Sequence, residues 1–445
     1  MSSSLPPCPK IALVGTLPPW KGISPYCEAL ARALATADPA TPLTFLDFDQ
    51  LYPAGLYPGA SMTAATPAIP PAALPVNLIH RRELHYARPD EAFKLGRSLD
   101  ADVLHVQFWS EFLAPTLSML IDGFHAAATA GHPRRVVMTL HNLAPHEDPA
   151  ALPFLKRIAQ SWKDPFGLEA VRRADAWIVH YAAGRAELAA RLPVGAHDRI
   201  HVIPHGLLEP APAVTPAQPA AANSSFINPS SISSVPSRAA ARTRLRPLLP
   251  RPLPADAPLF LLFGNLRPYK GVDVALRALA LCAADPSAQA HLLVAGSPWK
   301  DFDLAAMQSL ADDLDVADRV DWITTFIPDT AVADLLAAAD ALVLPYTRFD
   351  AMSGVASLGL RAGLPAIVSR VGGLPEMIPP DARDRLVIPP SDPAALAQAI
   401  TALLADPALA SAAARPPAEF LARFQWPAIA DQTRQLYRSV VPELK

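Results

Sequence analysis

Short apolar runs alternate with amphipathic stretches along most of the chain, and this alternation constrains the fold more than any other feature. Runs such as KIALVG (10–15) and LFLLFG (259–264) are apolar nearly throughout, whereas SPYCEALARALATA (24–37) spaces its apolar residues at helical intervals. Strands that are apolar on both faces are typical of parallel sheets covered by helices on both sides. The sequence therefore predicts an α/β fold with doubly wound sheets.

A charge-free segment, PAPAVTPAQPAAANSSFINPSSISSVPS (210–237), divides these runs into two sets. Its composition and lack of apolar periodicity are typical of a flexible insertion. Because 445 residues are too many for one ordinary domain, we predict two, each with about six strands. The predicted parts are an N-terminal Rossmann-like domain (1–206), a low-complexity insertion and linker (207–257), a C-terminal Rossmann-like domain (258–423), and a C-terminal helix (424–445) that could pack back onto the first domain.

Charge and cysteine content exclude several classes of protein. The net charge of -3 lacks the basic excess of a nucleic-acid-binding protein. Cys8, Cys27 and Cys282 form no CxxC pair, so we expect neither a disulfide framework nor a zinc site. We find no signal peptide and no apolar run of about 18 residues, so we expect a cytoplasmic protein. The basic segment 80–97 is interpreted as a solvated helix face, although peripheral contact with the inner face of a membrane stays open.

The ends of the second set of strands carry a pattern suited to a diphosphate. FGNLRPYKG (263–271) places Arg267 and Lys270 directly after a strand, and Ser353-Gly354-Val355 opens a helix after another. Ligands of doubly wound sheets bind at the carboxyl ends of the strands, and helix N-termini favour anions. The two cations would hold further phosphate oxygens and neutralise charge as the phosphate leaves. With two such domains, we expect the site in a cleft between them.

The first domain gives weaker signals at its strand ends. The loop GTLPPWKGISPY contains Gly22 before a helix, but it lacks the GxGxxG fingerprint of dinucleotide-binding proteins. His141 ends another strand and is followed by His146 and Glu147. A structural and a functional role are equally compatible with this histidine, and its spacing to the next histidine fits no usual zinc site. The sequence offers no aspartate cluster for magnesium, so we expect no metal and no cofactor.

At these residues the sequence resembles the family 4 glycosyltransferases, retaining enzymes of the two-Rossmann GT-B fold. The resemblance covers most of the chain outside the insertion and the proline-rich loop at 52–75. It rests on the order and spacing of several motifs, which are GTLPPWKGISPYCEALARAL, VQFWSEFLAP, TLHNLAPHE, ADAWIVH, VIPHG, FGNLRPYKGVD, VAG and SGVASLGLRAGLPAIVSRVGGLPEMI. It implies transfer of a sugar from a nucleotide-sugar donor to an acceptor, with retention at the anomeric carbon.

The resemblance also implies roles for individual residues, which match the family motifs position by position. The residues implied in catalysis are His141, Arg267, Lys270 and Glu376, those implied in donor binding are Gly22, Gly264, Asn265, Phe326, Ile327, Ser353, Gly354, Val355 and Gly373, and those on the acceptor side are Trp109, His146 and Glu147. The implied partners are a nucleotide-sugar donor and a glycan, lipid-linked or small-molecule acceptor, and the implied process is polysaccharide or glycoconjugate biosynthesis.

Two departures from the family pattern keep other functions open. The family has two glutamates eight residues apart around the helix that begins near Gly354. Here Asp350 could replace the first glutamate. The second glutamate usually holds the ribose, and at its position this chain has Leu358 or Gly359, neither of which can replace it. The usual arginine position after the strand glycine is occupied by Asn265. The alternatives are a sugar-nucleotide epimerase or phosphorylase of the same fold, or a catalytically silent binding subunit.

Overall fold

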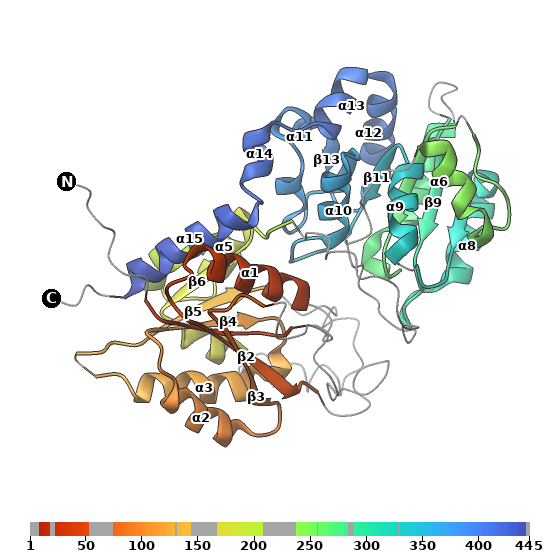
Figure 1. Ribbon diagram of the computed structural model, residues 1–445. Coiled ribbons are helices and arrows are strands. Elements are labelled where there is room, and N and C mark those ends of the chain that lie inside the picture. The colour runs from red at the N-terminus through yellow and green to blue at the C-terminus, as the bar shows by residue number, and fades with distance from the viewer. Residues whose placement is uncertain are drawn as a thin grey trace. The chain divides into compact units, whose positions relative to one another are not determined.

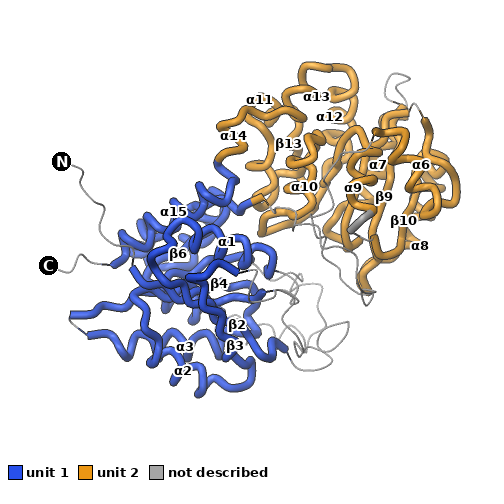
Figure 2. Tube along the Cα trace, in the orientation of Figure 1, with its two compact units in different colours: residues 1–206, 423–445 blue, residues 207–422 orange. Residues whose placement is uncertain are grey.

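The computed structural model consists of two compact units, which Figure 2 shows in different colours. The first unit contains residues 1–206 and 423–445, and the second contains residues 207–422. The structure describes residues 9–17, 23–52, 74–129, 131–143, 167–207, 237–255, 257–283, 289–327 and 329–441. Each unit is an α/β fold built on a parallel sheet, so the predicted fold class is confirmed.

The described part of the first unit contains a seven-stranded parallel sheet with the order β3-β2-β1-β4-β5-β6-β7 (Figure 1). The strands are β1 (Ile11–Val14), β2 (Leu43–Gln50), β3 (Leu78–His85), β4 (Val103–Phe108), β5 (Arg135–Leu140), β6 (Ala176–Val179) and β7 (Ile200–Val202). The helices are α1 (Ser24–Ala37), α2 (Pro89–Ser98), α3 (Ala114–Ala126), α5 (Ala182–Ala189) and α15 (Trp426–Val440). In Figure 1, α1 and α15 lie on one side of this sheet, and α2 and α3 lie on the other.

Strand β3 corrects one expectation from the sequence. We expected residues 80–97 to form a solvated helix face, but their first part lies in β3, and α2 begins only at Pro89. Within β3, Leu78 and Leu84 are buried, while the residues between them are partly or fully exposed. Because β3 is the edge strand of the sheet, it keeps polar residues that a central strand would not tolerate.

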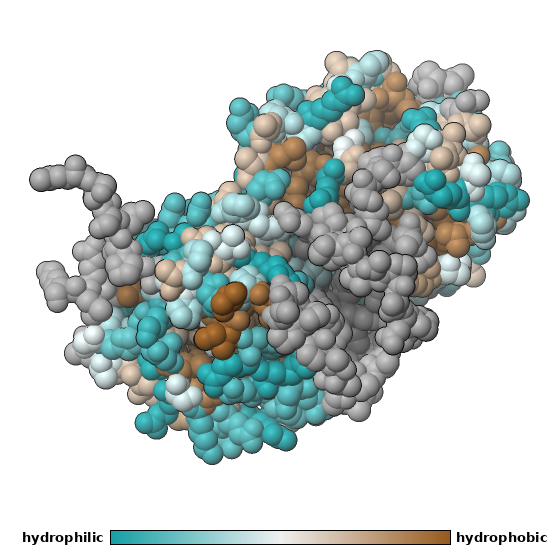
Figure 3. Space-filling view, viewed as in Figure 1, coloured by the Kyte–Doolittle hydropathy of each residue, from teal (hydrophilic) through white to brown (hydrophobic). Residues whose placement is uncertain are grey.

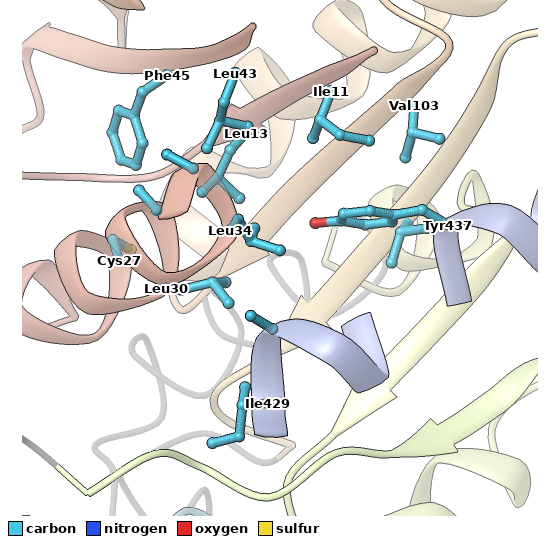
Figure 4. Close-up of a cluster of buried hydrophobic side chains, with 14 of the residues drawn as sticks. Ile11, Leu13, Cys27, Leu30, Leu34, Leu43, Phe45, Val103, Ile429 and Tyr437 are labelled. Carbon is cyan, nitrogen blue, oxygen red and sulfur yellow. The ribbon is translucent and has the colours of Figure 1, made fainter. Parts of the chain in front are cut away.

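Helix α15 completes the core of the first unit, although it follows the whole second unit in the sequence. Its buried residues Trp426, Ile429 and Tyr437 join a cluster that includes Leu30 of α1 and Leu13 of β1 (Figure 4). An amphipathic helix of this kind gains most of its stability from burying its apolar face. The final helix is therefore an integral part of the first unit.

The described part of the second unit contains a six-stranded parallel sheet with the order β10-β9-β8-β11-β12-β13. The strands are β8 (Leu259–Phe263), β9 (His291–Ala295), β10 (Val320–Ile323), β11 (Ala341–Leu344), β12 (Ala366–Ser369) and β13 (Val387–Ile388). The helices are α6 (Arg238–Leu245), α7 (Val272–Ala283), α8 (Leu304–Asp313), α9 (Asp329–Ala338), α10 (Gly354–Ala362), α11 (Pro380–Leu386), α12 (Pro393–Ala405), α13 (Pro407–Ala414) and α14 (Ala418–Ala422).

Helix α6 lies within the segment that we expected to be insertion and linker. It packs against α9 and is anchored by the buried side chain of Arg242. This guanidinium donates hydrogen bonds to the carbonyl oxygens of Ala338 (3.1 Å) and Ala255 (2.8 Å). Residues 238–245 are therefore part of the second unit rather than a free connection.

No single helix of the described residues has the length and apolar character required to cross a bilayer. Among them, a bent pair, Pro393–Ala405 with Pro407–Val440, meets those two criteria only when its members are taken together. On the face drawn in Figure 3, the described apolar residues form patches separated by hydrophilic ones.

Candidate functional site

The strand order of the second unit creates a switch point between β8 and β11. The chain leaves β8 toward β9 on one side, whereas it leaves β11 toward β12 on the other side. Loops that diverge in this way open a crevice at the carboxyl ends of the two strands, where doubly wound proteins bind ligands. The predicted diphosphate residues follow these two strands.

Lys270 is the best-defined side chain at this switch point. It lies in the short 3-10 helix Pro268–Lys270 after β8, and only 6% of it is exposed. Its Nζ donates hydrogen bonds to Tyr346 Oη at 2.6 Å and to the carbonyl oxygen of Phe263 at 3.3 Å. Burial lowers the pKa of Lys270. A bound anion would oppose this shift, because an opposite charge stabilises the ammonium form.

The other side of this lysine is formed by the loop after β11 and by the start of α10. Ser353 caps α10 by accepting a hydrogen bond from the backbone N–H of Ala356 (3.3 Å). Burial raises the pKa of Tyr346, and a side-chain hydrogen bond with Ser353 opposes that increase. Lys270, Tyr346 and Ser353 therefore form a connected group at the N-terminus of a helix, where backbone N–H groups and the helix dipole favour an anion.

Glycines keep this group accessible to a ligand. Gly264 has a φ of 106°, and a Cβ placed on it would lie 3.1 Å from Lys270 Nζ and 3.4 Å from Val355 Cγ2. A Cβ on Gly354 would meet nothing within 4 Å, so the first turn of α10 is open. The structure thus brings together Gly264, Lys270, Ser353 and Val355, which are four of the predicted residues.

We expect Gly271→Ala to destabilise the second unit by about 2–4 kcal/mol. Gly271 has a φ of 69°, and its Cβ would lie 2.0 Å from the carbonyl oxygen of Pro345, so the turn that carries Lys270 has to move. Thermal or urea unfolding measures the change. Gly354→Ala is the matched control, because its Cβ meets nothing, and an equal loss of stability in both variants would contradict this explanation.

Arg267 occupies different surroundings from Lys270. Its guanidinium lies 5.2 Å from the centre of the Trp299 ring, and its Nη2 is 3.4 Å from Asp301 Oδ2. The buried Nε of Arg267 has no hydrogen-bond partner. Burial raises the pKa of Tyr269, and the charges of Lys270 and Arg267 oppose this increase, so both cations lie near that ring. A ligand phosphate that engaged Nη2 of Arg267 would therefore compete with Asp301 for it.

The paired glycines after β12 hold the loop that leads to Ser353. Gly373 donates its backbone N–H to the carbonyl oxygen of Ala351 (3.1 Å), and a Cβ on Gly373 would lie 2.0 Å from Met352 Sδ. Gly372 has a φ of 51°. Glu376 follows in the 3-10 helix Leu374–Met377 and is partly exposed. These close contacts explain why glycines occur here, and they hold in place the loop that leads into α10.

The remaining predicted donor residues lie after β8 and β10. Asn265 is partly exposed directly after Gly264, and the next residue, Leu266, pairs with Pro298 after β9. After β10, Phe326 is 44% exposed, whereas Ile327 is buried. These residues follow parallel strands and so lie at the same edge of the sheet as Lys270.

In the first unit, His141 follows β5 and is buried. Its Nε2 lies 2.9 Å from Gln107 Oε1 on the adjacent strand β4. Trp109 follows β4, donates its indole N–H to Tyr52 Oη (3.2 Å), and accepts at its carbonyl oxygen a hydrogen bond from Asn142 (2.9 Å). The loops that carry Trp109 and His141 are thus joined directly. The predicted residues Gly22, His146 and Glu147 lie outside the described residues.

Two further histidines surround Tyr26 together with His141. The ring centres of His141, His180 and His205 lie 4.8, 5.3 and 4.7 Å from that of Tyr26. Burial lowers the pKa of His180 to about 3 and that of His205 to about 4, and it lowers the pKa of His141 well below its ordinary range. The three rings are therefore neutral at physiological pH. Sequence reasoning missed His180 and His205, although ADAWIVH and VIPHG place them after successive strands.

Among the residues that the structure describes, no group of three or more histidine, cysteine, aspartate or glutamate side chains is arranged to hold a metal ion.

Comparisons with known proteins agree with this architecture. Residues 20–207 match the family described as Glycosyltransferase Family 4, and residues 257–406 match Glycosyl transferases group 1. A D-inositol 3-phosphate glycosyltransferase of Xylanimonas cellulosilytica is 30% identical over 305 residues, which are 68% of this chain and 64% of the relative. One from Catenulispora acidiphila is 33% identical over 199 residues, which are 43% of this chain and 46% of the relative. The chain therefore spans about half to two thirds of the length of these curated relatives.

Solved structures show the same fold at lower identity. A sucrose-phosphate synthase from Thermosynechococcus elongatus matches with a TM-score of 0.60 and 21% identity, over 97% of this chain and 98% of that one. HepE of Anabaena, crystallised with UDP, matches with a TM-score of 0.63 and 16% identity, over 97% of this chain and 100% of that one.

Proposed function

Because the chain belongs to the family 4 glycosyltransferases, we propose that it transfers a sugar from a nucleotide-diphosphate-sugar donor to a hydroxyl acceptor, with retention at the anomeric carbon. The acceptor classes in question are a glycan, a lipid-linked glycan and a small molecule. The named relatives make inositol 3-phosphate the first small acceptor to test, and the UDP-bound neighbour makes UDP-sugars the first donors.

The observation that carries this proposal is the buried ammonium of Lys270 beside the open N-terminus of α10. A buried cation is costly unless it is paired, and here its partners are a hydroxyl and a carbonyl rather than a carboxylate. A diphosphate would supply the missing negative charge, and the backbone N–H groups of α10 would bind other oxygens of the same group. Such an arrangement favours the leaving diphosphate, whose charge grows during transfer.

In the proposed reaction, the bond between the anomeric carbon and the diphosphate oxygen breaks while the acceptor oxygen bonds to the same face of that carbon. The acceptor proton passes to the departing diphosphate oxygen, so no separate carboxylate base is required. Lys270 stabilises the departing charge, with Arg267 in a supporting role. His141 and Trp109 are assigned to the transferred sugar and the acceptor, and charge is supplied by side chains without a metal.

Screening sugar nucleotides by thermal stabilisation and by donor hydrolysis tests this function directly. A bound donor at 100 times its Kd should raise the free energy of unfolding by about 2.7 kcal/mol. Transfer to an added acceptor should continue in EDTA, and the product should keep the anomeric configuration of the donor. The proposal would be contradicted if no nucleotide sugar stabilised the protein and none was hydrolysed by it.

The same screen separates the alternatives. An epimerase converts the sugar nucleotide without an acceptor, and a phosphorylase consumes inorganic phosphate. A silent binding subunit binds a nucleoside diphosphate in calorimetry without turnover on any acceptor. The best support for this last alternative is that Leu358 and Gly359, at the position of the usual ribose glutamate, are buried in α10.

A further inference from the structure

Buried polar side chains form a continuous line beneath His141 in the first unit. Gln107 and His105 lie two residues apart on β4, and His141 and Thr139 are related in the same way at the end of β5. Because side chains on a strand alternate between faces, all four residues point to the same side of the sheet. Tyr437 of α15 completes the line on that side.

The distances connect these groups into one hydrogen-bonded chain. Tyr437 Oη lies 2.6 Å from His105 Nδ1, and His105 Nε2 lies 3.1 Å from Gln107 Nε2. The other end of the Gln107 amide, Oε1, lies 2.9 Å from His141 Nε2. Thr139 Oγ1 lies 2.7 Å from His105 Nε2. Apart from His141, the side chains of this line are fully buried, so water cannot replace these partners.

We propose that Gln107 is a positioning residue, which holds His141 as the neutral tautomer with its proton on Nε2. The amide oxygen of Gln107 can only accept, so His141 Nε2 must donate to it. The amide nitrogen must donate, so His105 Nε2 accepts and the proton of His105 lies on Nδ1, where it is donated to Tyr437 Oη. The inference deepens the proposed function, on which the role of His141 in transfer rests.

This arrangement fixes what His141 offers to a ligand. With its proton on Nε2, the other ring nitrogen, Nδ1, is a hydrogen-bond acceptor and can receive a sugar hydroxyl. The titratable side chains that face His141 are Tyr26, His180, His205 and, through Gln107, His105. Burial of these rings favours their neutral forms, so the orienting groups are a hydrogen-bonded amide and uncharged partners rather than a carboxylate.

The tautomer is measured by nitrogen-15 NMR of the histidine rings, with the His141 signals assigned from the difference to His141→Gln. We expect the wild type to show Nε2–H at His141. Gln107→Glu should keep this tautomer, because a carboxylate still accepts from Nε2. Gln107→Leu should give a mixture of tautomers. Thr116→Val is the matched control, since it removes a buried hydroxyl elsewhere in the unit and should leave His141 unchanged.

Activity provides a second measurement. In Gln107→Leu, kcat should fall about tenfold or more with a smaller change in the KM for the donor, and Gln107→Glu should retain more of the activity than Gln107→Leu. An Nδ1–H tautomer in the wild type, or an unchanged tautomer in Gln107→Leu, would overturn the inference. If the NMR results are as expected but no variant, including the wild type, transfers a sugar, then the proposed function fails and the role of Gln107 in orienting His141 stands.

Discussion

Lys270→Met is expected to reduce kcat/KM for sugar transfer by about 100-fold or more. The ammonium of Lys270 would contact the departing diphosphate, and methionine has similar length but no charge. Burying an ammonium without a carboxylate partner is costly, so an apolar side chain of similar length at this position should not prevent folding. The variant should therefore fold while losing the thermal stabilisation by nucleoside diphosphates, which separates ligand binding from folding.

Controls make this result specific to the site. Lys94→Met changes an exposed lysine on α2 of the first unit and should retain full activity. Steady-state kinetics and calorimetry with UDP provide the measurements. The double variant Arg267→Ala, Lys270→Ala is the most demanding test, because full turnover in that protein would remove both cations from the mechanism.

Acid should unfold the first unit. Burial lowers the pKa of His105 and His180 to about 3 and that of His205 to about 4, and His141 is shifted in the same direction. In the unfolded chain these side chains bind protons below pH 6.5 or so, whereas in the folded unit they do not. The unfolded state then binds more protons, so stability is complete above that pH and falls as the pH decreases.

The expected size of this effect is large. Each fully shifted histidine costs about 1.4 kcal/mol per pH unit, so His105, His180 and His205 together cost about 4 kcal/mol per unit, and His141 adds to this loss. Since domains are stable by about 5–15 kcal/mol, this slope removes their stability about 1 to 4 units below pH 6.5, and we expect unfolding between about pH 5.5 and pH 3. Burial raises the pKa of Asp47, so this carboxyl makes the free energy of unfolding increase as the pH falls, opposite to the histidines. One carboxyl does not offset three or more histidines.

Urea unfolding monitored by tryptophan fluorescence at several pH values measures this slope. His180→Gln removes one of the buried rings and should make the dependence on pH shallower by about 1.4 kcal/mol per unit. His197 lies outside the cluster, so the stability of His197→Gln should depend on pH as that of the wild type does. Stability that stays constant between pH 7 and pH 5 would contradict the expectation.

The two sheets could be predicted from the sequence because central parallel strands are apolar on both faces. Runs such as KIALVG and LFLLFG correspond closely to β1 and β8. Strand β3 was not recognised, because an edge strand retains polar residues and so lacks that pattern. Helix α6 was missed for a different reason, since it lies close to a charge-free segment and is stabilised by contacts with α9 that the local sequence does not contain.

The sequence predicted the candidate site only in part. Lys270, Gly264 and Ser353 could be placed together because each follows a strand of one sheet or opens the helix that comes after it. The partner hydroxyl of Tyr346 and the pairing of Arg267 with Asp301 depend on side-chain directions, which the order of strands does not determine. The grouping of His141 with His180 and His205 around Tyr26 was not predicted, because the three histidines end separate runs of the sequence and come together only through their common position after parallel strands.

The contribution of α15 to the first core also has a consequence for synthesis. The polypeptide emerges from the ribosome from its N-terminus, so residues 1–206 are exposed before Trp426, Ile429 and Tyr437 have been made. Residues 207–422 contain their own complete sheet and can fold in the meantime. The half of the molecule that is translated first therefore completes its core only after α15 has been made, and until then the apolar surface that α15 covers stays exposed.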